Sequence, residues 1–174
     1  MFFLSEKLNF GGERRKAGYV DDAAIDKILQ LLSVPNALAC AISLETGLRI
    51  SDVLALKTKG FKRRMRVKES KTGKVRTVTM PDALFRLAQA QAGETYVFPG
   101  RLDPAKHRTR QAVYCDLVGV AKRLKLTAHV TPHSMRKAYA VHAYRRLGDL
   151  RAVQRLLGHK DIATTMIYAL ADKL

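Results

Sequence analysis

A single change of hydrophobic period, at residues 64–80, constrains the fold more than any other feature. The sequence there reads RMRVKES and VRTVTM, two alternating segments rich in β-branched residues and separated by KTGK. Alternation with period two is typical of strands, and a short connection containing glycine is typical of a hairpin. Most other segments space their apolar residues as amphipathic helices do. The chain is therefore predicted to be α+β, predominantly α-helical with a small antiparallel β-sheet.

Helices are expected on both sides of this hairpin. Asp21 or Asp22 suits the N-cap of the first, Gly47 suits the C-terminal end of the second, and Ser51 suits the cap of the third. A further short strand is expected at 95–100, in TYVFPG. The expected helices cover residues 20–32, 36–47, 51–56, 81–91, 109–124, 132–148, 149–158 and 162–168.

Positive charge is the dominant compositional feature, and it is clustered. The chain has 32 Lys and Arg against 15 Asp and Glu, a net charge of +17. Ten of the basic residues lie in 57–76, where Glu69 is the one acid, and thirteen lie in 101–155. A generally solvated basic surface would spread its charge. Clustering instead favours a binding face for a polyanion, of which nucleic acid is the usual example.

Cysteine content and hydropathy indicate the compartment. Cys40 and Cys115 have apolar neighbours and no CxxC spacing, so two buried thiols in a reducing compartment are expected. No apolar run approaches the roughly 18 residues that a membrane span needs. We therefore expect a cytoplasmic, nucleoid-associated protein.

The segment TPHSMRKAYA is predicted to begin a helix and to bind an anion there. Thr131 is a good N-cap and Pro132 suits the first turn. His133 and Arg136 are three residues apart and so share one face. The positive end of the helix dipole disfavours cations in this turn, which an anion bound at the helix end would explain. The alternative is a solvated surface pair.

Three other candidates are weak when taken singly. Arg49 lies in a tight corner after Gly47, where it either faces a cleft or pairs with an acid such as Asp52. Lys71 lies at the tip of the hairpin, and His159 lies in a loop between two helices. A charged turn and a loop histidine are ordinarily structural.

No cofactor or metal site is expected. His129 and His133 are four residues apart, but Thr131-Pro132 interrupts any helix between them, and no acid or cysteine completes a zinc ligand set. The GxxxxGK[ST] phosphate loop and a distinctive Ser or Cys triad are both missing from the sequence.

In combination these signals carry more weight. Four motifs, TGLRISDVLAL, SKTGKVRTV, PHSMRKAYA and LLGHKDIATTMIYA, occur in that order. The set closely resembles the tyrosine recombinase (phage integrase) family across residues 20–169. The resemblance implies the DNA breaking–rejoining fold, with a catalytic domain at 19–174 preceded by an N-terminal tail or linker remnant at 1–18.

The resemblance also implies roles. Tyr168 matches the nucleophile, which would form a 3′-phosphotyrosyl bond and release a 5′-hydroxyl. Arg49 and Arg136 match the two arginines that clamp the non-bridging phosphate oxygens, so that no metal is needed.

The remaining roles concern protons and hydrogen bonds. His133 matches the residue that accepts the tyrosine proton or orients the phosphate. Lys71 matches the hairpin lysine that protonates the departing 5′-oxygen, for which Lys74 is a second candidate. His159 matches a hydrogen-bond donor to the phosphate.

The function so implied is that of a site-specific recombinase or integrase acting on double-stranded DNA as a homo-oligomer, a tetramer. Type IB topoisomerase-like DNA relaxation and a non-catalytic DNA-binding remnant are the alternatives. Family members usually carry an N-terminal helical clamp, and here about twenty residues precede the catalytic part, as in a fragment or a compact protein. DNA binding by this chain alone should then be weak and salt-dependent. The short segment after Tyr168 leaves delivery in cis or in trans open.

Overall fold

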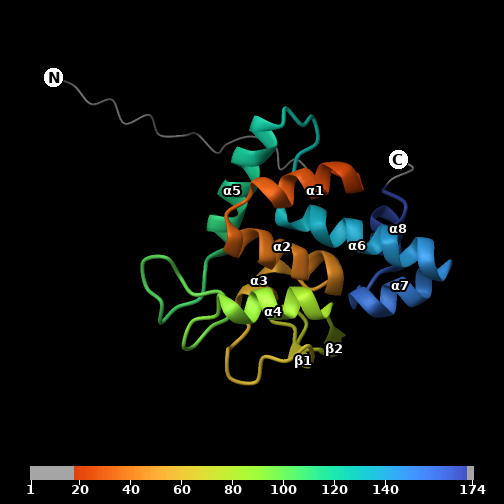
Figure 1. Cartoon of the computed structure of the whole chain (residues 1–174). Helices are drawn as coiled ribbons and strands as arrows, with labels where there is room; N and C mark the ends of the chain where they lie inside the picture. Colours follow the sequence, from red (N-terminus) through yellow and green to blue (C-terminus); the bar gives the residue numbers. More distant parts are fainter. Residues whose placement is uncertain (1–17, 172–174) are drawn as a thin grey trace.

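Three helices, a two-stranded sheet and five further helices follow one another along residues 18–171, the part of the chain that this computed structural model describes (Figure 1). The predicted α+β class is confirmed. The predicted tail at 1–18 lies almost wholly outside the described residues. The elements are α1 (Asp22–Leu31), α2 (Val34–Thr46), α3 (Ile50–Leu54), β1 (Arg64–Lys68), β2 (Val75–Thr79), α4 (Asp82–Ala90), α5 (Arg110–Arg123), α6 (Pro132–Leu147), α7 (Leu150–Leu157) and α8 (Ile162–Ala169).

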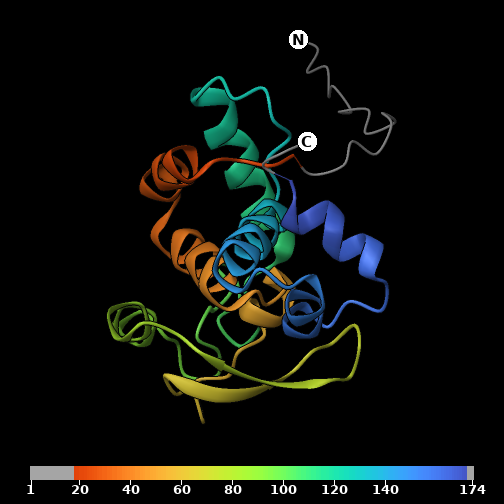
Figure 2. The same ribbon diagram turned by 90° about the vertical axis from the view of Figure 1, so that its right-hand side faces the viewer.

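Helix α2 lies at the centre and packs against α1, α3, α4 and α6 (Figures 1 and 2). Its apolar residues point in several directions, as expected of a helix surrounded by others, and Ile42 is fully buried. The helix begins at Val34, two residues before the predicted start, because Pro35 is accommodated in the first turn, where its missing N–H costs nothing.

The corner between α2 and α3 places the first predicted arginine. Gly47 ends α2 in the left-handed conformation, with φ of 66°. Helix α3 then begins at Ile50, so the N-cap position falls on Arg49, which makes no side-chain capping bond. The prediction that Ser51 caps this helix is wrong, because the helix starts one residue before it.

Substitution of Gly47 by alanine should be much more destabilising than the same change at Gly148. Both glycines have φ of 66°, so both variants carry the cost of a left-handed alanine, about 1–2 kcal/mol. A methyl group at Gly47 would also lie 2.5 Å from two ring carbons of Tyr139, whereas nothing lies within 4 Å at Gly148. Overpacking of that kind raises the expected loss in the free energy of unfolding of Gly47→Ala to about 2–5 kcal/mol.

Urea unfolding of the two variants measures this difference. Gly148→Ala is the matched control, because it has the same backbone strain without the clash. Equal losses in the two variants would show that Tyr139 moves aside at no cost.

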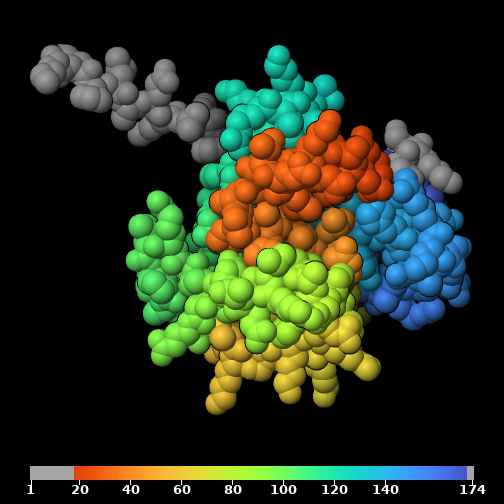
Figure 3. All heavy atoms as spheres, viewed as in Figure 1, coloured from red at the N-terminus to blue at the C-terminus, as the bar shows by residue number. Residues whose placement is uncertain are grey.

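The two strands form the predicted antiparallel hairpin, in a register that pairs Arg64 with Thr79 and Lys68 with Val75. Val67 and Val78 are buried, while the residues that alternate with them are exposed. Figure 2 shows the hairpin below the helices, and Figure 3 shows side chains of the yellow segment, which contains β1, projecting at the lower edge. The outer face is basic because β1 presents Arg64, Arg66 and Lys68 there.

The strand predicted at 95–100 does not form. Only an isolated bridge joins Tyr96 to Lys57, supported by a hydrogen bond from the Thr58 amide to the Thr95 carbonyl oxygen at 3.1 Å. The partner segment turns away directly afterwards, since the Phe61 amide donates back to the Thr58 carbonyl oxygen. A second isolated bridge joins Pro99 to His107, so the segment pairs at two separate points and not along a continuous strand.

The two cysteines differ. Cys40 is buried in α2 as predicted, but Cys115 is exposed, so that half of the prediction is wrong. Helix α5 turns Val113, Leu117 and Val120 toward the core, and Cys115 falls on its opposite side.

The end of α6, with α7 and α8, packs around a small apolar cluster separate from the main core. Its buried members are Ala140, Ala143, Val153 and Leu157, and Tyr139, Tyr144, Leu156 and Tyr168 pack against them. The last two predicted site residues, His159 and Tyr168, are therefore carried by a unit with its own apolar centre.

Candidate active site

Four of the six predicted site residues line one cleft of about 170 Å³: Arg49, Lys71, His133 and Arg136. They come from the α2–α3 corner, the hairpin turn and the first turns of α6. Arg110, at the start of α5, lines the same cleft and adds a further positive charge. Residues far apart in the sequence thus form a single concave surface whose charged members, Arg49, Lys71, Arg110 and Arg136, are all cations.

The start of α6 is built as predicted. The Thr131 hydroxyl accepts a hydrogen bond from the His133 amide at 3.2 Å, and the Ser134 hydroxyl accepts one from the Thr131 amide at 3.2 Å. This reciprocal capping box fixes the first turn, with Pro132 inside it. His133 and Arg136 then face the cleft together, which rules out the alternative of a solvated surface pair.

Arg136 is buried, with 2% of its surface exposed. Its Nη1 donates to the carbonyl oxygen of Gly47, and its Nη2 donates to that of Leu157 at 2.5 Å. Burial and the neighbouring charge of Arg49 lower the pKa of Arg136 to about 10. Arg136 is therefore still a cation at neutral pH. Arg136 therefore joins α6 to the end of α2 and the end of α7.

A buried carboxylate, Glu69, lies behind the two arginines. Its Oε2 accepts from Nη1 of Arg49 at 2.8 Å, its Oε1 accepts from Nη1 of Arg76 at 3.0 Å, and Nη1 of Arg136 lies 4.0 Å from Oε1. Burial alone would raise the pKa of Glu69, but hydrogen bonds from Thr72, Arg49 and Arg76 outweigh it and lower the pKa to about 2. Glu69 is therefore an ionised carboxylate at neutral pH.

Of the two alternatives for Arg49, the cleft is the one that the structure shows, and the acid that pairs with Arg49 is Glu69 rather than Asp52. Asp52 instead accepts two hydrogen bonds through Oδ1, from the Ser70 amide at 2.9 Å and the Ser70 hydroxyl at 2.6 Å. The hairpin brings Glu69 to Arg49 and Ser70 to Asp52, so the acid nearest in sequence is not the partner. Both contacts hold the hairpin directly before Lys71.

Lys71 and His133 lie at the exposed rim of the cleft. Desolvation by the surrounding protein lowers the pKa of His133, and the charges of Arg110, Arg136, Arg49 and Lys71 lower it further. The imidazole is therefore neutral at pH 7 and able to accept a proton.

His159 and Tyr168 do not line the cleft but lie against each other beside it. Their rings meet edge to face, with centroids 5.3 Å apart and planes at 79°. Burial lowers the pKa of His159 to about 4, with the charges of Arg136 and Arg49 acting in the same direction. Its Nδ1 lies 3.1 Å from the Thr165 hydroxyl oxygen, which orients the ring. The structure thus gives a neutral imidazole next to the terminal phenol.

Tyr168 is half-buried on α8, and the ammonium of Lys137 lies 5.4 Å from the centre of its ring. Burial raises the pKa of the phenol, although the charges of Arg136 and Arg49 oppose that shift. The phenol is therefore protonated at neutral pH. It needs a base before it can act as a nucleophile.

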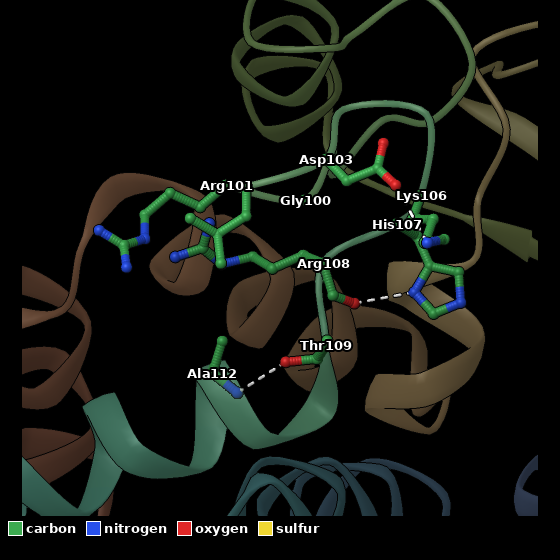
Figure 4. Close-up of a pocket in the computed structure, with 9 residues that line it drawn as sticks. Gly100, Arg101, Asp103, Lys106, His107, Arg108, Thr109 and Ala112 are labelled. Atoms are coloured by element: carbon green, nitrogen blue, oxygen red, sulfur yellow. Dashed lines mark hydrogen bonds and ion pairs between the residues drawn. The ribbon is translucent and has the colours of Figure 1, made fainter.

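A larger cavity of about 330 Å³ lies elsewhere, under the loop 100–109 (Figure 4). Its lining includes Arg101, Lys106 and His107 but none of the six predicted residues. The loop is held internally, by the Asp103–Lys106 ion pair at 3.1 Å and by the His107 Nδ1–H that donates to the Arg108 carbonyl oxygen at 2.8 Å. We therefore locate the candidate site in the smaller, cationic cleft.

Sequence reasoning missed Glu69 and Arg76 behind the cleft and Arg110 within it. Glu69 had one available signal, as the single acid in the basic stretch 57–76. Arg76 and Arg110 had none, because each was one basic residue among many.

The sequence matches the phage integrase family over residues 20–174. It is 34% identical to the tyrosine recombinase XerC of Xanthomonas campestris pv. campestris, over 91% of this chain and 53% of that protein. The tyrosine recombinase XerD of Bradyrhizobium diazoefficiens is 35% identical, over 88% of this chain and 53% of that protein. The chain thus spans about half the length of the curated relatives it matches.

Solved structures show the same fold. A lambda integrase dimer bound to a COC′ core site superposes with a TM-score of 0.74 at 18% identity, covering 90% of this chain and 49% of that one. XerA recombinase gives a TM-score of 0.73 at 20% identity, covering 89% and 61%. The predicted DNA breaking–rejoining fold is confirmed.

Proposed function

Because this chain belongs to the phage integrase family, we propose that residues 19–174 form the catalytic domain of a tyrosine-type site-specific recombinase. The observation that carries the proposal is the cleft in which Arg49, Lys71, His133 and Arg136 meet. Its dimensions and charge suit one phosphodiester, and the phenol of Tyr168, carried by α8, lies against His159 beside the cleft.

The first step of the proposed reaction is attack on phosphorus. The Tyr168 oxygen forms a bond to the scissile phosphorus while its proton passes to the neutral imidazole of His133. Arg49 and Arg136 donate to the non-bridging oxygens, whose charge increases in the pentavalent transition state. His159 adds a hydrogen bond to the same phosphate.

The second event is departure of the leaving group. The bond from phosphorus to the 5′-oxygen breaks, and Lys71 supplies the proton that the oxygen needs. The product is a 3′-phosphotyrosyl ester and a free 5′-hydroxyl. The phosphotyrosyl ester retains the bond energy of the phosphodiester that was broken. A 5′-hydroxyl from another strand can therefore attack the ester, reverse the step and join to a new partner. The protein's own cations stabilise the charge, and the step consumes no cofactor.

The proposed partner is double-stranded DNA, bound by a homo-oligomer, a tetramer, in the cytoplasm with the nucleoid. Net charge of +17 and the cationic cleft support DNA as the ligand. Solved structures of the same fold include a lambda integrase dimer bound to a core site and a Tn1549 transposon integrase in complex with a circular intermediate DNA. No helix within residues 18–171 is long and apolar enough to cross a membrane.

A nicked suicide duplex tests the proposal, because attack releases a short 5′-hydroxyl fragment and traps the enzyme. We expect a protein–DNA adduct that survives SDS. Addition of a second duplex with a free 5′-hydroxyl should then release the protein and give a joined recombinant strand. An adduct that only religates to its own strand, with relaxation of supercoiled DNA, would indicate a topoisomerase. Binding without any adduct would indicate a non-catalytic remnant.

A further inference from the structure

We propose that Glu69 is a positioning residue, whose buried carboxylate holds the guanidinium of Arg49 in place for the phosphate. The inference rests on the proposed function and extends it to a residue outside the cleft lining. Glu69 comes from the end of β1, and no substrate atom needs to touch it.

The contacts place Glu69 where the catalytic elements meet. Its side chain is fully buried, and both carboxylate oxygens are occupied. Oε2 accepts from Arg49 and from the Thr72 hydroxyl, each at 2.8 Å, while Oε1 faces Arg76 and Arg136. A Cβ on Gly158 would lie 3.7 Å from Oε2, so the carboxylate also borders the segment that carries His159.

Charge explains why a carboxylate is needed there. Arg49, Arg76 and Arg136 bring three cations to one poorly hydrated place, and cations so close repel one another. Glu69 is the single anion that the structure places among them. Without it, Arg49 would be expected to rotate toward water, since its side chain is already 16% exposed, whereas Arg136 is held by two carbonyl oxygens.

The arrangement leaves Arg49 free to act. Glu69 occupies one nitrogen of Arg49, Nη1, which leaves its Nε and Nη2 without a protein partner among the described residues. A guanidinium fixed at one corner and free at the others can present two parallel donors to a phosphate. The carboxylate therefore orients Arg49 without competing for the donors that the phosphate requires.

Glu69→Gln tests the proposal, because glutamine has the same shape and no charge. The readout is the single-turnover rate of adduct formation on the nicked duplex at saturating DNA. We expect the rate to fall about 10- to 100-fold, the size of loss that follows when an orienting carboxylate is removed from behind a functional group. DNA affinity should change less than about threefold, since Glu69 is buried and the substitution removes none of the 32 Lys and Arg that can contact phosphates.

A second substrate distinguishes a loss of arginine positioning from a general disturbance of the active-site structure. In a methylphosphonate at the scissile position, a methyl group replaces one non-bridging oxygen, so the reacting group is neutral and depends less on the two guanidiniums. We expect the rates of Glu69→Gln and the unsubstituted chain to differ less than about threefold on this substrate. An equal loss on both substrates would overturn the proposal, and so would an unchanged rate on the phosphodiester.

Two further variants complete the test. Asp82→Asn removes a carboxylate from an exposed ion pair with Arg86 and should alter neither rate. Thr72→Val removes one neutral hydrogen bond from Glu69 and keeps its charge, so it decides the matter if Glu69→Gln does not fold. The proposal is supported if Thr72→Val modestly slows adduct formation on the phosphodiester but not on the methylphosphonate. An identical change of rate on both substrates contradicts it. Failure of the unsubstituted chain to form any adduct would instead overturn the proposed function.

Discussion

Tyr168→Phe should abolish the SDS-resistant adduct with the nicked suicide duplex while DNA binding is retained. Removal of a catalytic nucleophile costs roughly 10⁴-fold or more, which places the residual rate below detection in this assay. The substitution deletes one oxygen atom. The ring keeps its edge-to-face contact with His159 and its place against the small apolar cluster, so the fold of α8 should not change.

Tyr144→Phe is the matched control for this experiment. Tyr144 packs on the same apolar cluster as Tyr168, but from α6, and it lies outside the cleft lining. Adduct formation should be unaffected in this variant. A full yield of adduct in Tyr168→Phe would remove the phenol from its role, and loss in Tyr144→Phe with retention in Tyr168→Phe would identify a different nucleophile.

Lys71→Ala should slow adduct formation by about 10²- to 10⁴-fold, the range over which general acids contribute. Lys71 is exposed at the hairpin tip, so its removal should leave the stability of the protein almost unchanged. The loss arises because the 5′-oxygen leaves as an alkoxide, a strong base, when no acid protonates it.

A 5′-bridging phosphorothiolate provides the diagnostic for this role. Sulfur replaces the leaving oxygen, and a thiolate is a far weaker base than an alkoxide, with a thiol pKa of about 8.5. The substrate should therefore restore Lys71→Ala to within about tenfold of the unsubstituted chain, since protonation is no longer required. Equal defects on oxygen and sulfur substrates would assign Lys71 to DNA binding alone.

Lys74→Ala is the control for the lysine assignment. Lys74 lies on the same turn and is also exposed, but it does not line the cleft. It should behave as the unsubstituted chain on both substrates. If Lys74→Ala instead showed the loss and the rescue by sulfur, the general acid would be Lys74.

The local elements followed from the sequence because local interactions decide them. The alternation in 64–80 could form only strands, and the Thr131 and Pro132 pair could only begin a helix, as the capping box at α6 confirms. The failure of the strand predicted at 95–100 was not local in origin. Tyr96 has the composition of a strand residue, but pairing requires a partner segment, and that segment turns away after Lys57.

The candidate site could be predicted from the sequence only in part. Motif order and spacing identified six residues, and the structure brings four of them into one cleft, with His159 and Tyr168 together beside it. The sequence could not show that Arg136 is buried against the carbonyl oxygens of Gly47 and Leu157. Those bonds depend on how α6 packs against α2 and α7, which no single segment encodes.

The sequence by itself determined which side chains are available: a clustered excess of cations, a hairpin that ends near a lysine, a helix that begins with His133 and Arg136, and a phenol near the C-terminus. Tertiary structure alone decided which of them meet. Arg49 had an acid three residues away in Asp52, yet its partner is Glu69, twenty residues away, because the hairpin folds back beneath α3. Ion pairing depends on distance in space and on burial, and both are set by the packing of the whole domain.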